Sequence, residues 1–218
     1  MPRKTAPSFV SARVCGETAA TRFAFRKRIV TECSMSPVQR ATAVENLFPS
    51  GAIAFEVRGV ASPYDLFPSE REYVARSVES RVREFAAGRL CARAGLAELG
   101  FKPTPLLPGL DRAPLWPSGI VGSITHTDGY CVAVVGLDTK FAAIGVDAER
   151  IGYVSSSLWH LTMRAEELRR LQFLEEPARR QMATVIFSAK EAFYKCQHAL
   201  THRWLEFEDL YGDRKSVV

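Results

Sequence analysis

The chain has 218 residues, of which 47% are hydrophobic and 24% are charged, so it can bury a core as one large domain or as two small packed lobes. No apolar run approaches the roughly 20 residues of a membrane-spanning helix, and the N-terminus lacks the apolar stretch of a secretory signal, so we expect a cytoplasmic protein without a membrane span. The five cysteines are widely spaced and form no C-x-x-C pair, which predicts reduced thiols.

The net charge of +5 comes from residues 1–34. Seven of the 29 Lys and Arg residues and two of the 24 Asp and Glu residues lie there, so the remaining 22 bases and 22 acids cancel. We interpret this basic head as a disordered, non-essential extension, with a targeting peptide or a polyanion-binding arm as the alternatives. The neutral body gives no reason to expect a nucleic-acid partner.

Hydrophobic patterns separated by Pro and Gly predict the elements of the body. The expected elements are a strand at 52–57, a helix from Ser69 to Gly100, strands at 121–126, 130–137 and 142–151, and helices between about 164 and 197. The last two strands are expected to form a hairpin. This order predicts an α/β or α+β fold of two lobes with similar ingredients, which we place at 35–138 and 139–218.

Two carboxylates lie in the last of these strands, in the sequence GVDAERI. Asp147 and Glu149 are two positions apart and project from one face, while Ile144, Val146 and Ala148 face the core. Like charges this close raise one another's pKa unless a cation lies between them. The alternative is a solvated face of an edge strand, with Arg150 as the partner of the acids.

Three further segments carry polar groups that suit phosphate chemistry. Glu191 and Lys195 share a helix face in FSAKEAFYK, but Ser188 and Glu191 also fit a capping box and Glu191 with Lys195 a surface ion pair. In GSITHTDGY, hydroxyls and an imidazole collect where a strand enters a turn, although a lone His there is more often structural. Arg81, Arg89 and Arg93 form a basic stripe on the first long helix, which usually faces solvent.

Together and in this order, the motifs resemble those of the 4′-phosphopantetheinyl transferases of the surfactin and enterobactin type. The matching segments are R-x-R-E-F-x-x-G-R (81–89), PLWPSGIVGSITH (114–126), GVDAER (145–150), FSAKEAFYK (187–195) and LTHRWLEFEDL (200–210). The resemblance implies two pseudo-symmetric lobes, each a small sheet packed with helices, with the active site in the cleft between them. It also implies transfer of the 4′-phosphopantetheine arm of coenzyme A to a serine of an apo acyl or peptidyl carrier protein, releasing adenosine 3′,5′-bisphosphate.

The resemblance also implies roles for individual residues. Magnesium, with manganese as the alternative, is expected on Asp147, Glu149 and Glu191. Catalysis is expected from Glu191 or a metal-bound water as the base, from Lys195 at the leaving oxygen, and from His126. The residues expected to contact coenzyme A are Arg81, Arg89, Thr125, His126, Asp147, Lys190, Glu191, Lys195 and Trp204. One departure is Pro108, where many relatives carry a basic residue, and Arg112 is a candidate substitute.

Two other functions fit the same residues. A metal-dependent pyrophosphatase or nucleotidase would use the same acids without a carrier protein, and a degenerate relative would bind coenzyme A or a carrier domain without transfer. If the chain is a transferase, we expect it to be a monomer. The pathway is left open between fatty-acid, polyketide, nonribosomal-peptide and siderophore assembly.

Overall fold

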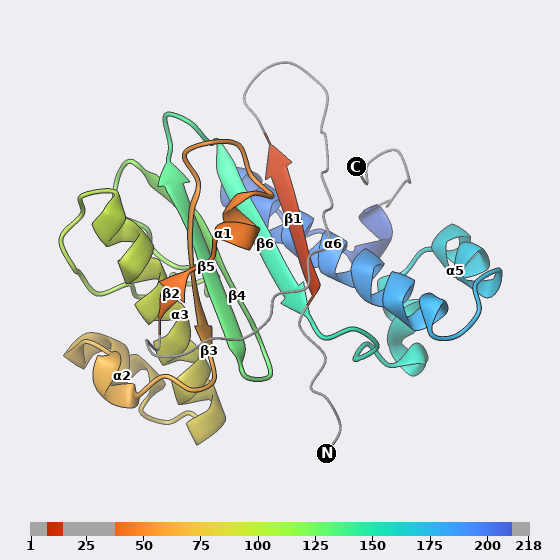
Figure 1. Cartoon of the computed structure of the whole chain (residues 1–218), viewed down its shortest axis with the longest axis horizontal. Helices are drawn as coiled ribbons and strands as arrows, with labels where there is room; N and C mark the ends of the chain where they lie inside the picture. The colour runs from red at the N-terminus through yellow and green to blue at the C-terminus, as the bar shows by residue number, and fades with distance from the viewer. Residues whose placement is uncertain (1–7, 15–37, 211–218) are drawn as a thin grey trace.

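The computed structural model describes residues 8–14 and 38–210. Figure 1 shows the strands in the middle of the view, with one long helix on either side of them. The elements are, in chain order, β1 (Ser8–Val14), β2 (Gln39–Arg40), α1 (Thr42–Glu45), β3 (Ile53–Arg58), η1 (Pro63–Asp65), α2 (Pro68–Val74), α3 (Glu79–Glu98), β4 (Ile120–Thr127), β5 (Tyr130–Leu137), β6 (Ala143–Glu149), η2 (Ser156–Leu158), α4 (Trp159–Thr162), α5 (Ala165–Gln172), α6 (Ala178–Thr201) and η3 (Phe207–Asp209).

Strands β2, β3, β5 and β4 form a four-stranded antiparallel sheet in that order, and β1 pairs antiparallel with β6 in a second, two-stranded sheet. Strand β6 lies beside β4 (Figure 1), and β4 hydroxyls accept hydrogen bonds from the β6 backbone. The N–H of Val146 donates to Ser123 Oγ (3.1 Å) and that of Ala148 to Thr125 Oγ1 (3.3 Å). Side chains therefore connect the two sheets.

The core lies on both faces of β5, which explains its uninterrupted apolar sequence. Ala133 and Val135 join the cluster under α3, while Val132 and Val134 join a second cluster that includes Ile144, Val146 and Ala148 of β6. The expected inward face of β6 is therefore confirmed. Its other face, with Asp147, is turned toward α6.

A glycine sets the distance between β6 and α6. A Cβ atom at Gly145 would lie 2.0 Å from the carbonyl oxygen of Ala192 and 2.9 Å from the backbone nitrogen of Cys196. Any side chain there would have to push the α6 backbone away, because neither obstacle is a flexible side chain. The glycine of G-x-D-x-E thus lets α6 approach β6 closely enough for their polar side chains to meet.

The predicted mixed α/β class is confirmed, and several local predictions are corrected. The expected hairpin between 130–137 and 142–151 is wrong: β5 pairs with β3 and β4, and its hairpin partner is β4 through the Asp128–Gly129 turn. An Asp-Gly pair is the stronger hairpin signal. The expected helix from Ser69 to Gly100 is divided into α2 and α3, and the later helical region into α5 and α6. No helix in 38–210 is long and apolar enough to cross a membrane.

The N-terminal head differs from the disordered extension expected for residues 1–34. Residues Ser8–Val14 form β1, whose register runs from Ser8 opposite Glu149 to Val14 opposite Ala143. The rest of the head lies outside the described residues. Strand β1 therefore covers the edge of the strand that carries Asp147. The division into lobes at residue 138 stays a prediction.

Truncation tests the contribution of β1. A chain beginning at Cys15 lacks the strand and should melt about 4 to 8 °C lower than the full chain, the shift that a loss of about 2 kcal/mol produces at this size. A chain beginning at Ser8 keeps the strand and is the matched control. Equal melting temperatures for the two truncated chains would show that β1 adds nothing to stability.

Candidate active site

The carboxylate of Asp147 is the centre of the site. Its side chain is buried, and its two oxygens accept three hydrogen bonds from β4 and α6. Oδ1 accepts from Thr125 Oγ1 (3.0 Å) and from Lys195 Nζ (2.7 Å), and Oδ2 accepts from Ser188 Oγ (2.8 Å). A buried carboxylate needs such donors because it has lost its water.

The contacts of Lys195 and Ser188 decide against the ordinary-helix interpretation of FSAKEAFYK. Helix α6 begins at Ala178, so Ser188 and Glu191 lie well inside it and cannot form a capping box. Lys195 forms its described ion pair with Asp147, and its Nζ also donates to the carbonyl of Val146 (3.2 Å). Ser188 and Lys195 are seven residues apart on one face of α6, and that face packs against β6.

Two further carboxylates, those of Glu149 and Glu191, lie close enough to Asp147 for its charge to change their pKa. Burial raises the pKa of Glu149 to about 7, with the charge of Asp147 as the next cause and Glu191 as a smaller one, while Lys195 lowers it. Burial also raises the pKa of Glu191, where Lys195 opposes the shift and the charge of Asp147 adds to it. The three acids are thus near enough to destabilise one another's anions.

The three carboxylates are not, however, gathered at the distances of a closed metal site. Among the described residues, the group of three His, Cys, Asp or Glu ligand atoms that lie within 4.8 Å of one another is Asp111, His198 and His202. Lys195 also occupies one oxygen of Asp147.

His126 connects β4 to the start of α3. Its Nε2 lies 3.2 Å from Arg81 Nη1, and its Nδ1 lies 3.7 Å from Glu84 Oε2. Burial lowers the pKa of His126; the charges of Arg81 and Lys195 lower it too, and those of Glu84 and Asp147 raise it. Both ring nitrogens of His126 therefore face α3, with Nε2 toward Arg81 and Nδ1 toward Glu84. Thr125 differs from the expectation, because its hydroxyl is already committed to Asp147 and the β6 backbone.

The arginines of α3 separate into two roles. Arg93 is structural: its Nη1 donates to both oxygens of the buried Glu70 at 2.9 Å. Arg89 is buried over the ring of Phe85 (3.8 Å), and its Nε donates to the Leu106 carbonyl at 2.8 Å. Burial lowers the pKa of Arg89 to about 10. No hydrogen bond of its Nη groups to an acceptor in 38–210 is described. The solvent-face interpretation is therefore wrong for Arg89 and Arg93.

Lys190 is turned away from Asp147, in disagreement with the expected phosphate contact. Its Nζ donates to Glu167 Oε2 (2.6 Å) and to the carbonyls of Thr162 (3.1 Å) and Phe207 (3.0 Å). Lys190 precedes Glu191 by one residue, which is about 100° around a helix, so it faces the α4 and α5 side. The buried pair joins α6 to α5, and no local pattern predicts it because the partners are 23 residues apart.

Trp204 is also outside the Asp147 cluster. Its side chain is 73% exposed, its Nε1 donates to Glu206 Oε1 (2.9 Å), and its ring meets the edge of Tyr194. The described contacts therefore give no support to Trp204 as a pocket-lining residue.

Comparison with known proteins decides the family. The 4′-phosphopantetheinyl transferase N-terminal domain matches residues 69–136, and the 4′-phosphopantetheinyl transferase superfamily matches residues 143–217. The chain is 36% identical over 168 residues to 4′-phosphopantetheinyl transferase Npt of Nocardia iowensis, covering 77% of this chain and 75% of Npt. This chain belongs to the 4′-phosphopantetheinyl transferase superfamily.

Two more relatives of this transferase agree with the assignment. This chain is 40% identical over 145 residues to 4′-phosphopantetheinyl transferase PptT of Mycobacterium tuberculosis, covering 66% of this chain and 63% of PptT. It is 35% identical over 117 residues to enterobactin synthase component D of Salmonella typhi, covering 53% of this chain and 47% of that protein. Transfer of phosphopantetheine from coenzyme A to a carrier protein is the activity that the family assigns to this chain.

The Lys190 pair gives a prediction that separates folding from transfer. Lys190→Met removes the ammonium from the buried Glu167, whose Oε2 keeps the hydrogen bond from the Arg164 N–H, so the change should cost about 3 kcal/mol of unfolding free energy. The double variant Lys190→Met with Glu167→Gln removes both charges and should recover much of that loss. Phosphopantetheine transfer per folded molecule should stay within a few-fold of wild type in both. Normal unfolding together with much weaker coenzyme A binding in Lys190→Met would restore the phosphate role.

Proposed function

We propose that this transferase is magnesium-dependent and that Asp147, Glu149 and Glu191 hold the ion together with the pyrophosphate of coenzyme A. The observation that carries the proposal is the placement of Glu149 and Glu191 beside the buried carboxylate of Asp147, where burial first and the charge of Asp147 in addition raise the pKa of both, since a bound divalent cation would stabilise all three anions. Carboxylate oxygens are the donors that Mg²⁺ prefers. When bound, the ion supplies charge neutralisation and polarisation at the phosphate oxygens.

The remaining groups fit attack by a serine hydroxyl on the pantetheine-side phosphorus. The serine oxygen forms the new bond to phosphorus, and the bond from that phosphorus to the oxygen of adenosine 3′,5′-bisphosphate breaks. Glu191 is proposed to accept the serine proton, because its carboxylate lies on α6 one helical turn before Lys195. Lys195, which is partly exposed beside Asp147, is proposed to stabilise or protonate the leaving oxygen.

The nucleotide end of coenzyme A is assigned to the α3 and β4 side of the site. Arg89 offers Nη groups from a preorganised guanidinium, since its Nε and ring contacts hold it in place. Arg81 and His126 lie on the same side of the site, where Nη1 of Arg81 is 3.2 Å from Nε2 of His126. These three residues are proposed to bind phosphate oxygens of coenzyme A, including the 3′-phosphate.

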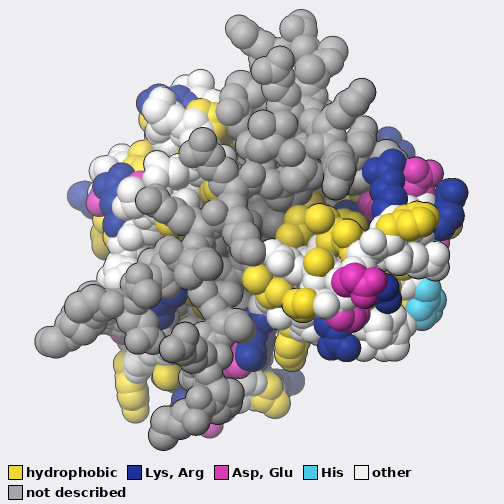
Figure 2. Space-filling view, turned by 45° about the vertical axis from the view of Figure 1, so that its right-hand side comes forward, with side chains coloured by type: hydrophobic (Ala, Val, Ile, Leu, Met, Phe, Trp, Pro, Cys, Tyr) yellow, Lys and Arg dark blue, Asp and Glu magenta, His cyan; other side chains and the backbone are white. Residues whose placement is uncertain are grey.

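The apo carrier protein is proposed to approach from the segment that follows Glu149. This segment exposes Tyr153 (69%), Leu158 (49%) and Leu161 (60%). Figure 2 shows hydrophobic side chains gathered on one face of the molecule, with charged side chains around them. Exposed apolar groups of this kind often mark protein contacts. A cytoplasmic location, a monomeric state and the choice of acyl or peptidyl carrier remain predictions.

Transfer by the full chain should depend on magnesium. With coenzyme A, Mg²⁺ and a panel of apo carrier proteins, intact mass should show the addition of one phosphopantetheine to a carrier. The product should disappear in EDTA, because the pyrophosphate charge is then uncompensated, and it should return when Mg²⁺ is added in excess.

Each component of that assay excludes one alternative. A carrier whose acceptor serine is replaced by Ala is the control and should gain no mass. Undiminished transfer in EDTA would contradict the metal assignment. Hydrolysis of coenzyme A without a carrier would favour a pyrophosphatase, and binding of coenzyme A without any product would favour a non-catalytic relative.

A further inference from the structure

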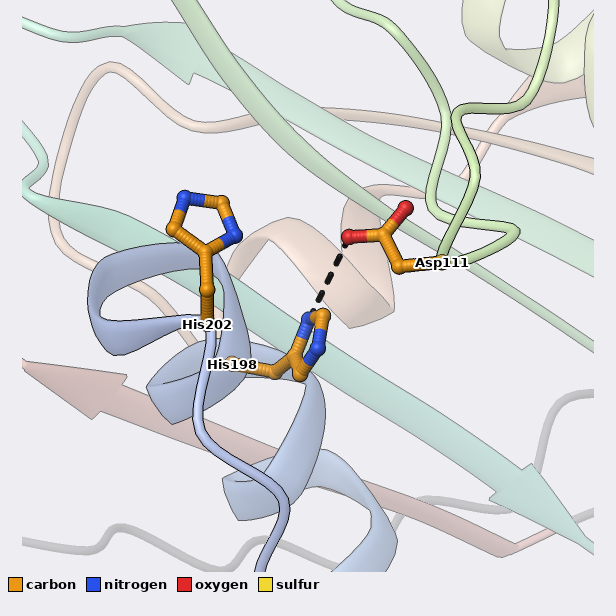
Figure 3. A group of neighbouring side chains, drawn as sticks. All are labelled: Asp111, His198 and His202. Atoms are coloured by element: carbon orange, nitrogen blue, oxygen red, sulfur yellow. Dashed lines mark ion pairs between the residues drawn. The ribbon is translucent and has the colours of Figure 1, made fainter.

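A second group of ligating side chains lies at the far end of α6. His198 is in the last turn of α6, His202 is its C-cap, and Asp111 comes from the loop between α3 and β4. One ligand atom from each residue lies within 4.8 Å of the other two. Figure 3 shows the Asp111 carboxylate pointing at the His198 ring, with the His202 ring on the neighbouring turn.

We propose that Asp111, His198 and His202 form a second metal site, which takes Zn²⁺ or a similar borderline divalent ion and joins the 106–115 loop to the end of α6. Two imidazoles and a carboxylate are the donors that such ions take, whereas Mg²⁺ prefers oxygen alone. The site is therefore distinct in chemistry from the carboxylates around Asp147.

The distances between the ligand atoms suit a bridging ion. Asp111 Oδ2 and His198 Nδ1 are 3.8 Å apart, which is too long for a hydrogen bond. Two zinc bonds of about 2.0 to 2.2 Å each can span that gap. A tetrahedral ion needs ligand atoms about 3.4 Å apart, and since these atoms all lie within 4.8 Å of one another, a small rotation of the exposed Asp111 and His202 side chains is enough.

The backbone holds all three residues in place. The N–H of His202 donates to the His198 carbonyl at 2.9 Å, and His202 is in the left-handed conformation at φ 52°. Asp111 Oδ1 accepts from the N–H of Ala113 at 3.0 Å, which leaves Oδ2 turned toward His198. The loop is itself closed by hydrogen bonds from Gly109 N–H to the Ala113 carbonyl and from Leu115 N–H to the Leu107 carbonyl, both at 2.8 Å.

The location gives the site a structural role. The loop that carries Asp111 also carries Arg112, whose φ of 65° is unusual for a residue with a side chain. Helix α6 carries Glu191 and Lys195 on the turns that precede His198. An ion here would fix the loop against the helix of the active site without contacting the reacting groups.

Metal titration of the full chain tests the site. The protein is prepared without a histidine tag, freed of metal with EDTA, and returned to buffer with Mg²⁺ in large excess, so that the active-site carboxylates do not report. We expect wild type to bind one equivalent of Co²⁺ with the visible spectrum of a low-coordinate nitrogen and oxygen site. Zn²⁺ should displace the Co²⁺ and raise the melting temperature.

Variants with nearly unchanged shape supply the comparison. His202→Asn keeps a residue that tolerates the left-handed C-cap, and Asp111→Asn keeps the oxygen that accepts from Ala113. Each should weaken Co²⁺ binding at least about tenfold, since removing even an outer partner of a metal site costs that much. His160→Asn, on the exposed α4 histidine, should bind like wild type.

Two results would overturn the site. If His202→Asn and Asp111→Asn bind Co²⁺ as tightly as wild type, the ion is adventitious only. If wild type takes up no Co²⁺ or Zn²⁺, the group is an ordinary surface ion pair. Neither result bears on magnesium-dependent transfer, because the titration requires no turnover.

Discussion

The buried carboxylate of Asp147 is the constraint on which the site depends. A charge removed from water must be met by donors, and here they come from two elements: Thr125 on β4, and Ser188 and Lys195 on α6. The close approach at Gly145 allows α6 to deliver its donors. The hydrogen bonds to the Asp147 carboxylate therefore also fix the positions of Glu191 and Lys195 on α6. Removing one donor would disturb both the packing of α6 and the geometry of the acids.

Helix α6 divides its polar residues by face. Ser188 and Lys195 face β6 and contact Asp147. Lys190 faces α5 and forms an ion pair with Glu167. Tyr194 and His198 lie on a third face, toward the end of the helix and the Asp111 loop. Adjacent residues of one motif thus serve different purposes. Lys190 has structural contacts although it adjoins Glu191, the proposed base, because one helical step turns its side chain by about 100°.

The sequence was informative where a pattern is local and less so where a partner is distant. The alternation in β6 correctly predicted that Ile144 and Val146 enter the core and that Asp147 and Glu149 share the other face. It could not show that Ser188 contacts Asp147, since the same residue also fits a helix cap and its partner is 41 residues away. The pairing of β1 with β6 was missed because the basic composition of the head suggested disorder. Burial of Arg89 was missed for a similar reason: a basic stripe does not reveal the loop that covers it.

The measurement that tests the central claim most directly compares transfer and melting in Glu191→Gln, with Glu175→Gln on the surface as the control. Glutamine keeps the shape of Glu191 but removes a charge that burial and Asp147 already disfavour. The melting temperature of Glu191→Gln should therefore be no lower than that of wild type, while turnover should fall on the order of 10²-fold, the scale of a lost general base. Glu175→Gln should change neither quantity. Near-normal transfer by Glu191→Gln would contradict the account, because the carboxylates around Asp147 would then not be the active site.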